Sequence, residues 1–432
     1  MNGTGTCSDA TPRASNSATS PWCTIGRATW GSTSATAPNS AEAARAGDTV
    51  EIAAGTYSTA CPRTSCASGT RWEVCLNPAN SGMPGRPITF RGVGRVRLQT
   101  ATGFAGPLIG AQQRSHLVWS NFFIDDATVT NCADTGSVVL HEASFVRLER
   151  LEVKGRYTAW SDNYNAIRIE AADDNVITDN LLYDVTGNAG HNDAAIMMYD
   201  SSRNIIENNT IRTSVTGIYV KGQHTGFVQE NNIFRRNLFE GMTNSAIILL
   251  AAIGSKVTQN VVKDCNVGVK IYPDPVGGRN VTLANNTIVR SGQAAFYVKP
   301  DGAQAVAYRV WNNVGARATG LAVDVGETVL GELSFEHNLW FGTSGFGSVA
   351  GANVTFAQWQ ATPHLRDAAP PAGQVADPLF VDEAGGNFRL ANGSPAAALG
   401  VDVADLDGDG NVTELIPAGA YVTGQEQIGQ RP

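Results

Sequence analysis

The sequence has 432 residues, of which 42% are hydrophobic and 16% charged, and its formal net charge at pH 7 is -8. This apolar content excludes intrinsic disorder, and the apolar runs are far shorter than the ~20 residues of a membrane-spanning helix. The acidic balance, without a basic block, excludes nucleic acid as the main partner. We expect a monomer with no nucleic-acid or membrane partner.

The cysteines are concentrated near the start of the chain. Six lie in the first third, and only Cys265 comes later. The six are Cys7, Cys23, Cys61, Cys66, Cys75 and Cys132. None has the paired spacing of a zinc site, so the pattern favours disulfides in an oxidising compartment, with Cys265 as a buried free thiol. We therefore expect a secreted protein whose signal peptide is absent from this sequence, since no signal-like segment follows Met1.

A short motif recurs along most of the chain: one or two apolar residues, an asparagine, and two more apolar residues. With Arg150 filling one gap, the motifs stand 23 to 30 residues apart. The asparagines are Asn121, Asn180, Asn209, Asn232, Asn260, Asn286, Asn313 and Asn338. Such an interval is too short for two helices but can hold three short strands. The period predicts a solenoid with asparagine at one corner, where it can bond neighbouring coils and tolerates the left-handed backbone.

Most intervals also contain a five-residue segment with the alternation of a β-strand. The segments align without gaps, and their second and fourth residues are always apolar. They are 166–170, 195–199, 217–221, 246–250, 268–272 and 295–299. We expect the second and fourth residues to point into a shared core and the third and fifth to point outward. Successive copies would stack as parallel strands.

These repeats and both ends of the chain resemble right-handed parallel β-helix proteins of the pectate-lyase-like superfamily. Residues 21–25, 46–50 and 54–57 resemble the opening of its secreted bacterial members. Residues 377–380 and 393–396 resemble their closing segment. The resemblance implies an all-β, right-handed parallel β-helix with a cap at each end, similar to secreted bacterial polysaccharide lyases.

We expect three parts along the chain. Residues 1–85 form a disulfide-stapled N-terminal cap with the first coils, residues 86–341 form the coils that carry the catalytic face, and residues 342–432 form a C-terminal capping region and tail. Both ends need covering, because an open coil would expose unpaired strand edges and the apolar interior.

The outward positions of a β-helix form columns, in which aligned side chains lie about 4.8 Å apart from coil to coil. These columns mix cationic and aromatic residues, which suits an acidic sugar chain, because cations pair with carboxylates and rings stack on sugar faces. The alternative is an ordinary solvated sheet face. The residues predicted to bind substrate are Tyr219, Lys270, Tyr272, Tyr297, Lys299, His141, Glu170 and His224.

The densest polar group lies between residues 160 and 225 and suits β-elimination at a uronate. That reaction needs a partner for the carboxylate, a base for the C5 proton and an acid for the leaving oxygen. We predict Arg168 as the carboxylate partner, Lys221 or His191 as the base, and Tyr199 as the acid. The resemblance implies the same residue types, since lyases of this superfamily use Lys, Arg, His or Tyr on this face, with or without calcium.

Two acidic groups are candidate Ca²⁺ sites. The candidate ligands are Asp162 and Asp193 on the outer face, and Asp405, Asp407 and Asp409 in the tail. The tail group matches the start of an EF-hand loop, but its twelfth position is Ile416 where a bidentate glutamate is required. A plain turn is therefore the alternative there.

The sequence thus predicts a secreted polysaccharide lyase that cleaves a uronic-acid-containing polysaccharide by β-elimination. A glycoside hydrolase is the first alternative and would draw two carboxylates from Asp162, Glu170 and Asp193. A uronate C5-epimerase would share the proton abstraction, and a non-catalytic carbohydrate-binding solenoid would need none of the predicted catalytic residues. Neither the pectate-lyase signature Arg-x-Pro-x-x-Arg nor the polygalacturonase Gly-His-Gly is present, which disfavours pectin as the substrate.

Overall fold

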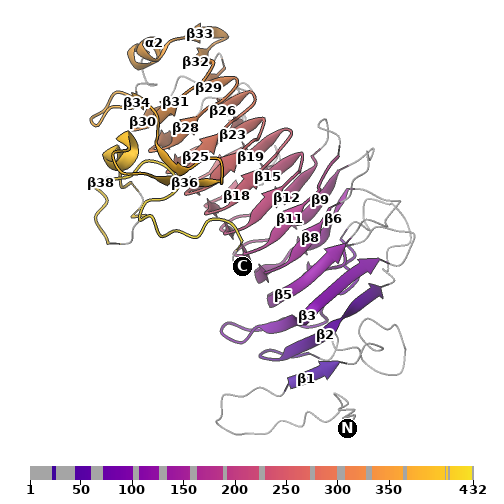
Figure 1. The fold of residues 1–432 in the computed structure, drawn as a ribbon. Helices are drawn as coiled ribbons and strands as arrows, with labels where there is room; N and C mark the ends of the chain where they lie inside the picture. The colour runs from indigo at the N-terminus through magenta and orange to yellow at the C-terminus, as the bar shows by residue number, and fades with distance from the viewer. Residues whose placement is uncertain are drawn as a thin grey trace.

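Short parallel strands separated by bends wind the chain into a solenoid, seen from the side in Figure 1. The fold is that of a computed structural model. It describes residues 22–25, 44–59, 72–100, 107–125, 134–155, 163–187, 192–222, 229–272, 278–298, 307–326, 333–362, 367–403, 405–406 and 409–430. The predicted all-β parallel β-helix is therefore confirmed.

One wall of the solenoid is an eleven-stranded sheet, parallel except at its last strand. In chain order its strands are β4 (Ile109–Gln112), β6 (Thr135–His141), β9 (Tyr164–Glu170), β12 (Ala194–Tyr199), β15 (Thr216–Lys221), β19 (Ser245–Leu250), β23 (Val267–Tyr272), β26 (Ala294–Val298), β29 (Leu321–Val325), β32 (Gly345–Val349) and β33 (Ala352–Val354). From β4 to β32, each strand is one coil further along the axis than the last, and β33 forms a hairpin with β32.

The other two walls belong to a 21-stranded sheet. Its strands are β1 (Trp22–Ile25), β2 (Thr49–Thr59), β3 (Ile88–Thr100), β5 (Ser115–Asp125), β7 (Ser144–Glu149), β8 (Glu152–Lys154), β10 (Val176–Thr178), β11 (Leu181–Tyr183), β13 (Ile205–Glu207), β14 (Thr210–Arg212), β17 (Ile233–Arg235), β18 (Leu238–Glu240), β21 (Lys256–Thr258), β22 (Val261–Lys263), β24 (Thr282–Ala284), β25 (Thr287–Val289), β27 (Tyr308–Trp311), β28 (Val314–Ala316), β30 (Leu333–Glu336), β31 (Leu339–Phe341) and β34 (Gln374–Val375).

The remaining elements are short and lie at a corner or in the C-terminal region. They are the pairs β16 (Gln229–Glu230) with β20 (Ala252–Ile253), β35 (Phe380–Asp382) with β36 (Asn387–Leu390), and β37 (Gly400–Val401) with β38 (Leu415–Ile416), the helix α2 (Phe356–Ala361) and the 3-10 turn η3 (Pro395–Ala398). Helix α2 closes the last coil, where the Trp359 side chain is completely buried against Phe335 and Phe346. In the described part of the chain, no helix has the length and apolarity needed to cross a bilayer.

The interior is filled by the residues that alternate inward along each strand. Ile167 and Ile169 of β9 and Ile218 and Val220 of β15 are completely buried in one continuous apolar cluster. Burying an aliphatic side chain of this size contributes roughly 1.5–3 kcal/mol to stability. The inward side of the predicted strand pattern is thus confirmed.

Two asparagine ladders, rather than one, run along the corners. The longer ladder comprises Asn180, Asn209, Asn237, Asn260, Asn286, Asn313 and Asn338, each amide donating to the next. Asn232 lies in a second ladder with Asn204, so its predicted place at the main corner is wrong. Both corners of a coil contain buried backbone groups that need a partner, and asparagine meets that need at either one.

At the main corner, the residue with left-handed backbone conformation is the one that directly precedes the ladder asparagine in sequence. Asp179 and Asn208 have φ of 57° and 54°, directly before Asn180 and Asn209. Asn121 has φ of 63° and occupies this preceding position, so it is not a ladder residue as the sequence motif predicted. The ladder asparagine bonds the coils, while its neighbour makes the bend.

The longer ladder ends on a buried carboxylate. Asn338 donates its backbone N–H and its side-chain amide to Asp367 Oδ1 at 3.0 and 3.1 Å. Trp340 Nε1 donates to Asp367 Oδ2 at 2.7 Å. The Asp367 side chain is completely buried, so it closes the ladder where the next coil would have supplied another asparagine.

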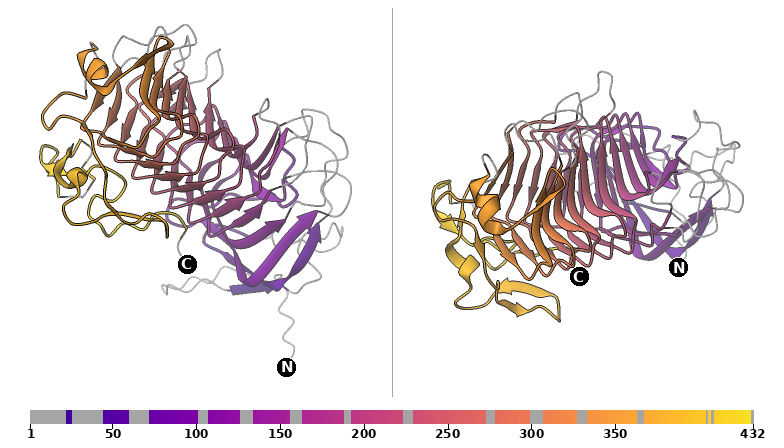
Figure 2. Two further views of the ribbon diagram at one scale, coloured as in Figure 1. Left: turned by 45° about the horizontal axis from the view of Figure 1, so that its top comes forward. Right: turned by 90° about the horizontal axis from the view of Figure 1, so that it is seen from above.

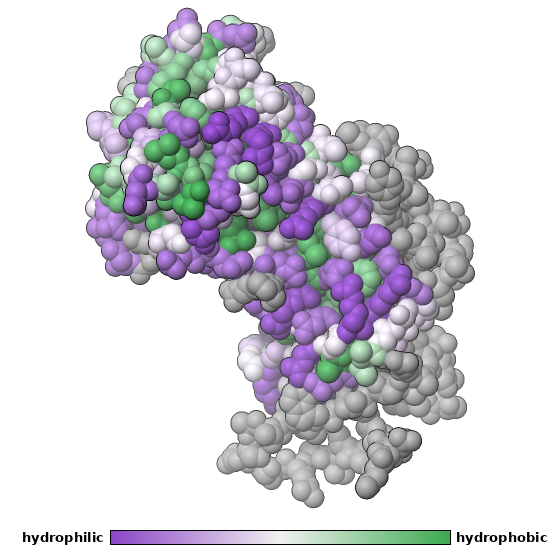
Figure 3. All heavy atoms as spheres, viewed as in Figure 1, coloured by the Kyte–Doolittle hydropathy of each residue, from purple (hydrophilic) through white to green (hydrophobic). Residues whose placement is uncertain are grey.

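The C-terminal tail runs back along the coils, and the C-terminus lies near the middle of the solenoid (Figures 1 and 2). Asn285 Nδ2 donates to the Pro417 carbonyl at 2.9 Å, and the Gly429 N–H donates to the Arg236 carbonyl at 2.8 Å. Figure 3 shows apolar side chains mostly over the C-terminal part of the chain, where Leu415 is among the exposed apolar residues. The described tail residues thus pack on a wall of the 21-stranded sheet, on β22, β25, β28 and β31.

Two cysteines lie among residues with described side chains. Cys75 is disulfide-bonded, and Cys265 is a buried free thiol, as expected. Cys7, Cys61, Cys66 and Cys132 lie outside the described residues, so the pairing within the N-terminal region stays a prediction.

Candidate active site

The outward residues of the eleven-stranded sheet form the two predicted columns. In one, Arg168 pairs with Met197, Met197 with Tyr219, and the series continues through Ile248 and Lys270. In the other, pairing runs through His141, Glu170, Tyr199, Lys221, Leu250 and Tyr272. We call these the third and fifth columns. The predicted register, including the place of His141, is therefore confirmed.

Arg168 is held on all sides, although it points outward from β9. Its side chain is 3% exposed. Its Nη1 donates to Asp134 at 2.8 Å, and its Nε and Nη2 donate to Glu170 at 3.0 Å each. The guanidinium carbon also lies 4.8 Å from the Trp72 ring and 4.7 Å from the Tyr199 ring. A substrate carboxylate would have to compete with Asp134 and Glu170 for this cation.

Tyr199 lies between Arg168 and Lys221 in the structure. It is 7% exposed, and its hydroxyl accepts a hydrogen bond from Asn192 Nδ2 at 3.3 Å. Burial raises the pKa of Tyr199 to about 12, although the nearby Arg168 cation acts in the opposite direction. The phenol therefore keeps its proton at any ordinary pH and is a potential proton donor.

Lys221 follows Tyr199 in the fifth column and is half-buried. Its Nζ donates to Asn192 Oδ1 at 3.4 Å, so one amide contacts both side chains. Burial lowers the pKa of Lys221 below the ordinary value of 10.5. A lowered pKa increases the fraction of neutral amine, which is the form that accepts a proton.

A second lysine and amide pair lies further along the same face. Lys270 Nζ donates to Asn244 Oδ1 at 2.9 Å and lies 5.5 Å from the centre of the Tyr297 ring. Tyr272 follows Lys270 on the same strand, and both tyrosines are half-buried. Tyr219 is half-buried as well and packs against Met197 and Tyr199. The predicted mixture of cations and rings is present on this part of the face.

Five of the predicted site residues lie outside the described residues. They are His191, His224, Asp162, Lys299 and Asp407. Their predicted roles stay predictions.

The described acidic residues do not gather into a metal site. In the ranges given above, no group of three or more His, Cys, Asp or Glu could hold a metal ion. Asp193 is 2% exposed and its Oδ1 accepts from the Tyr164 N–H at 2.7 Å. Asp405 and Asp409 are exposed and accept backbone N–H groups of their own turn. Because Asp407 lies outside the described residues, the calcium site in the tail stays a prediction.

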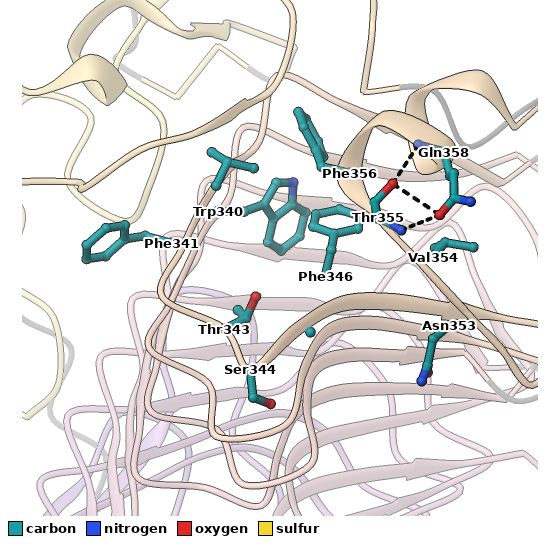
Figure 4. A pocket seen from close by; sticks show the side chains of 12 residues that line it. Trp340, Phe341, Thr343, Ser344, Phe346, Asn353, Val354, Thr355, Phe356 and Gln358 are labelled. Carbon is teal, nitrogen blue, oxygen red and sulfur yellow. Dashed lines mark hydrogen bonds between the residues drawn. The ribbon is translucent and has the colours of Figure 1, made fainter.

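A hollow of about 470 Å³ lies at the C-terminal end of the solenoid, between the last coil and α2. In Figure 4, Trp340, Phe346 and Phe356 turn toward one another at its wall. The other described lining residues are Phe341 and residues with hydroxyl, amide, glycine or aliphatic side chains, and none of them has an acidic or basic side chain. This hollow can hold a ligand, but its described side chains cannot transfer a proton, so the columns around Lys221 are the better candidate for catalysis.

The sequence prediction missed three contributors to the site. Asn192 stands between His191 and Asp193, which were both singled out, and its amide contacts Tyr199 and Lys221. Asn244 stands just before β19, and its side-chain oxygen accepts a hydrogen bond from Lys270 of the third column. Trp72 comes from the N-terminal region, far from the site in sequence, and no periodic signal points to it.

A family comparison fits this architecture. The family model for the right-handed β-helix region matches residues 110–288 and 189–358, which together span more than half of the chain. The protein belongs to this right-handed β-helix family. No curated protein matches the sequence.

Solved structures of right-handed β-helix proteins share the fold at low identity. Pectate lyase Pel9A is 13% identical with a TM-score of 0.50, and the alignment covers 88% of both chains. A family 6 polysaccharide lyase from Pseudopedobacter saltans is 12% identical with a TM-score of 0.49, covering 82% of this chain and 94% of that one. An exopolygalacturonase from Thermotoga maritima is 9% identical with a TM-score of 0.49, covering 71% and 85%. At 13% identity, the similarity to pectate lyase Pel9A shows the fold alone.

Proposed function

We propose that this β-helix protein is a lyase that cleaves a uronic-acid-containing polysaccharide by β-elimination. Lys221 is the base and Tyr199 is the acid. The observation that carries the proposal is the Asn192 amide, which contacts both side chains and so holds them as one unit. Their pKa values are shifted in opposite directions, which suits one group for taking a proton and the other for giving one.

The reaction begins when the neutral Lys221 amine removes the proton from C5 of the uronate. The electron pair of that C–H bond forms the C4–C5 double bond, and the bond between C4 and the glycosidic oxygen breaks. The Tyr199 hydroxyl gives its proton to the departing oxygen. The ammonium of Lys221 and the phenolate of Tyr199 then return to their starting forms by proton exchange, directly or through water.

Arg168 acts in this proposal as a positioning residue. It is buried, it is paired with Asp134 and Glu170, and it lies against the Tyr199 ring. Its charge stabilises the Tyr199 phenolate that forms as the proton leaves, because the two groups are within 5 Å through a desolvated region. It thereby supports the acid, and it can pair with the carboxylate of the reacting uronate only by giving up hydrogen bonds to Asp134 or Glu170.

Substrate binding falls to the half-buried residues further along the columns. Lys270 can pair with a uronate carboxylate, and Tyr272 and Tyr297 offer rings for sugar faces. Lys270 lies two coils beyond Tyr219 in the register Tyr219, Ile248, Lys270. The spacing is therefore on the order of 10 Å, which suits a neighbouring sugar of the same chain rather than the reacting one.

Hydrolysis receives less support from the described carboxylates. Glu170 accepts two hydrogen bonds from Arg168, and Asp193 is buried and accepts from the Tyr164 backbone. A hydrolase needs one carboxylic acid with a raised pKa and one free carboxylate on the same face. Elimination is therefore the reaction that we propose. Separately, an acidic polysaccharide substrate is consistent with the extracellular location predicted from the sequence.

The test is incubation of the protein with a panel of acidic polysaccharides. We expect ultraviolet absorbance from the conjugated double bond to rise together with the number of reducing ends. Reducing ends without that absorbance would identify a hydrolase. If neither signal appears, the protein is a binding protein or an epimerase. NMR distinguishes these two, because only an epimerase changes the sugar composition of the polymer.

A further inference from the structure

The third column of the eleven-stranded sheet begins with three residues that are almost completely buried. In the third column, Val139, Arg168 and Met197 are at most 3% exposed. Val139 and Met197 do not belong to the interior cluster, so their burial arises on the outside of the wall. Further along the column, Tyr219, Lys270 and Tyr297 are half-buried, while Ile248 is 3% exposed and Ser348 is 7% exposed.

Trp72 is a described residue that covers this N-terminal end. The segment that carries it runs along the edge of the sheet, where Leu76 bridges Ile109 of β4 and the Cys75 N–H donates to the Pro107 carbonyl at 2.8 Å. From there the Trp72 side chain reaches past β4 to two further coils. It stacks on the His141 ring at 4.4 Å with a 4° angle between the planes.

The Trp72 side chain is also fixed to the candidate active site. The Arg168 guanidinium lies between the Trp72 ring and the Tyr199 ring, at 4.8 and 4.7 Å from their centres. Hydrogen bonds to Asp134 and Glu170 fix the position of that guanidinium between the two rings. Since Cys75 is disulfide-bonded as well, the tryptophan is a rigid wall and not a side chain that a polymer could easily displace.

We propose that Trp72 closes the substrate groove at this end, so that the protein cleaves its polysaccharide from a chain end. This inference rests on the proposed lyase function. The Arg168 coil, which Trp72 covers, lies two coils before the Lys221 coil. Lys221 is therefore on the order of 10 Å from this wall along the axis, a length that corresponds to about two sugar rings. The remainder of the polymer extends over Lys270, Tyr272 and Tyr297 toward the C-terminal end.

The experiment follows product sizes from the first turnovers, using the polysaccharide that gives unsaturated product in the panel above. For the wild-type protein we expect one short unsaturated product throughout, with slow loss of solution viscosity. Trp72→Ala should release a range of longer oligosaccharides and lower the viscosity several-fold faster per bond cleaved. Trp72→Phe keeps a ring at the wall and should retain the short product.

Phe145→Ala is the matched control, because Phe145 is a 55% exposed aromatic side chain on β7, in a different wall. It should leave the product sizes unchanged. Thermal unfolding of each variant shows whether it is folded, and the wild-type product profile tests the inference even if Trp72→Ala does not fold. Unsaturated products of many sizes from the wild-type protein would overturn the closed end while leaving the lyase proposal intact. Absence of unsaturated product from every polysaccharide would overturn both.

Discussion

Tyr199 and Lys221 are partners in the parallel pairing of β12 with β15, one coil apart in the same outward column. Aligned side chains of neighbouring coils are about 5 Å apart at their base, so both residues can contact the same neighbouring group. Asn192 precedes β12 and reaches both of them. Two residues that are 22 positions apart in sequence thus share one amide.

Replacing the base should stop elimination without unfolding the protein. We expect Lys221→Ala to lower kcat by roughly 10²–10⁴-fold, since this is the usual contribution of a positioned base. Lys270→Ala is the comparison, because it removes a lysine of the same face that lies outside the proton transfer. It should raise KM by about tenfold with little change in kcat. Initial rates from ultraviolet absorbance would decide, and near-normal turnover of Lys221→Ala would remove Lys221 from the mechanism.

The pH dependence should follow the two shifted groups. The base acts in its neutral form, and burial lowers the pKa of Lys221 below 10.5, so the rate should rise with pH along a limb whose midpoint lies below 10.5. The acid acts in its protonated form, and burial raises the pKa of Tyr199 to about 12, so no loss of rate is expected until that region. A profile of kcat/KM against pH measures both limbs. A rate that falls as the pH rises from neutral would contradict the assignment.

A negative charge at position 192 should shift the rising limb of the pH profile, which reports Lys221, to higher pH. Asn192→Asp puts a carboxylate within reach of Lys221, which favours the ammonium and raises its pKa. The midpoint of the rising limb should shift to higher pH, and the rate near neutral pH should fall. Asn192→Ser, which is polar but uncharged, is the control and should leave the midpoint nearly in place. Equal midpoints for the two variants would show that Asn192 and Lys221 are not coupled.

The end of the asparagine ladder should make stability depend on pH. Burial raises the pKa of Asp367 to about 7, outweighing the N–H donors of Asn338 and Trp340 that favour the carboxylate. The folded protein therefore holds a proton that the unfolded chain releases near its ordinary pKa of 3.8. The stabilisation is complete below that value and is lost as the pH rises through about 7, by up to about 4 kcal/mol.

Asp367→Asn lacks this titration and separates it from the rest of the protein. Urea unfolding at about pH 4 and about pH 8 should show the free energy of unfolding of the wild-type protein falling relative to the variant. Parallel pH profiles for the two proteins would mean that Asp367 does not titrate in this window.

The repeat in the sequence was sufficient to predict the register of the columns. Alternating apolar residues at a nearly constant interval leave one way to bury one side of every strand, so the alignment of Arg168, Met197 and Tyr219 followed directly. The corner assignment was less secure, because Asn232 and Asn237 are both followed by two apolar residues and lie at different corners. Only the hydrogen bonds of each amide distinguish them.

The amino-acid sequence by itself determined the solenoid, its inward and outward faces, and the row of cationic and aromatic residues along one wall, because these depend on periodicity alone. The tertiary structure decided which of those residues are accessible and which are already paired. Arg168 is a cation like Lys221 in the sequence, yet Asp134, Glu170 and Trp72 enclose it. Those contacts join segments from different coils and from the N-terminal region. A repeat fixes the position of a residue in its own coil but carries no information about a segment that crosses over it.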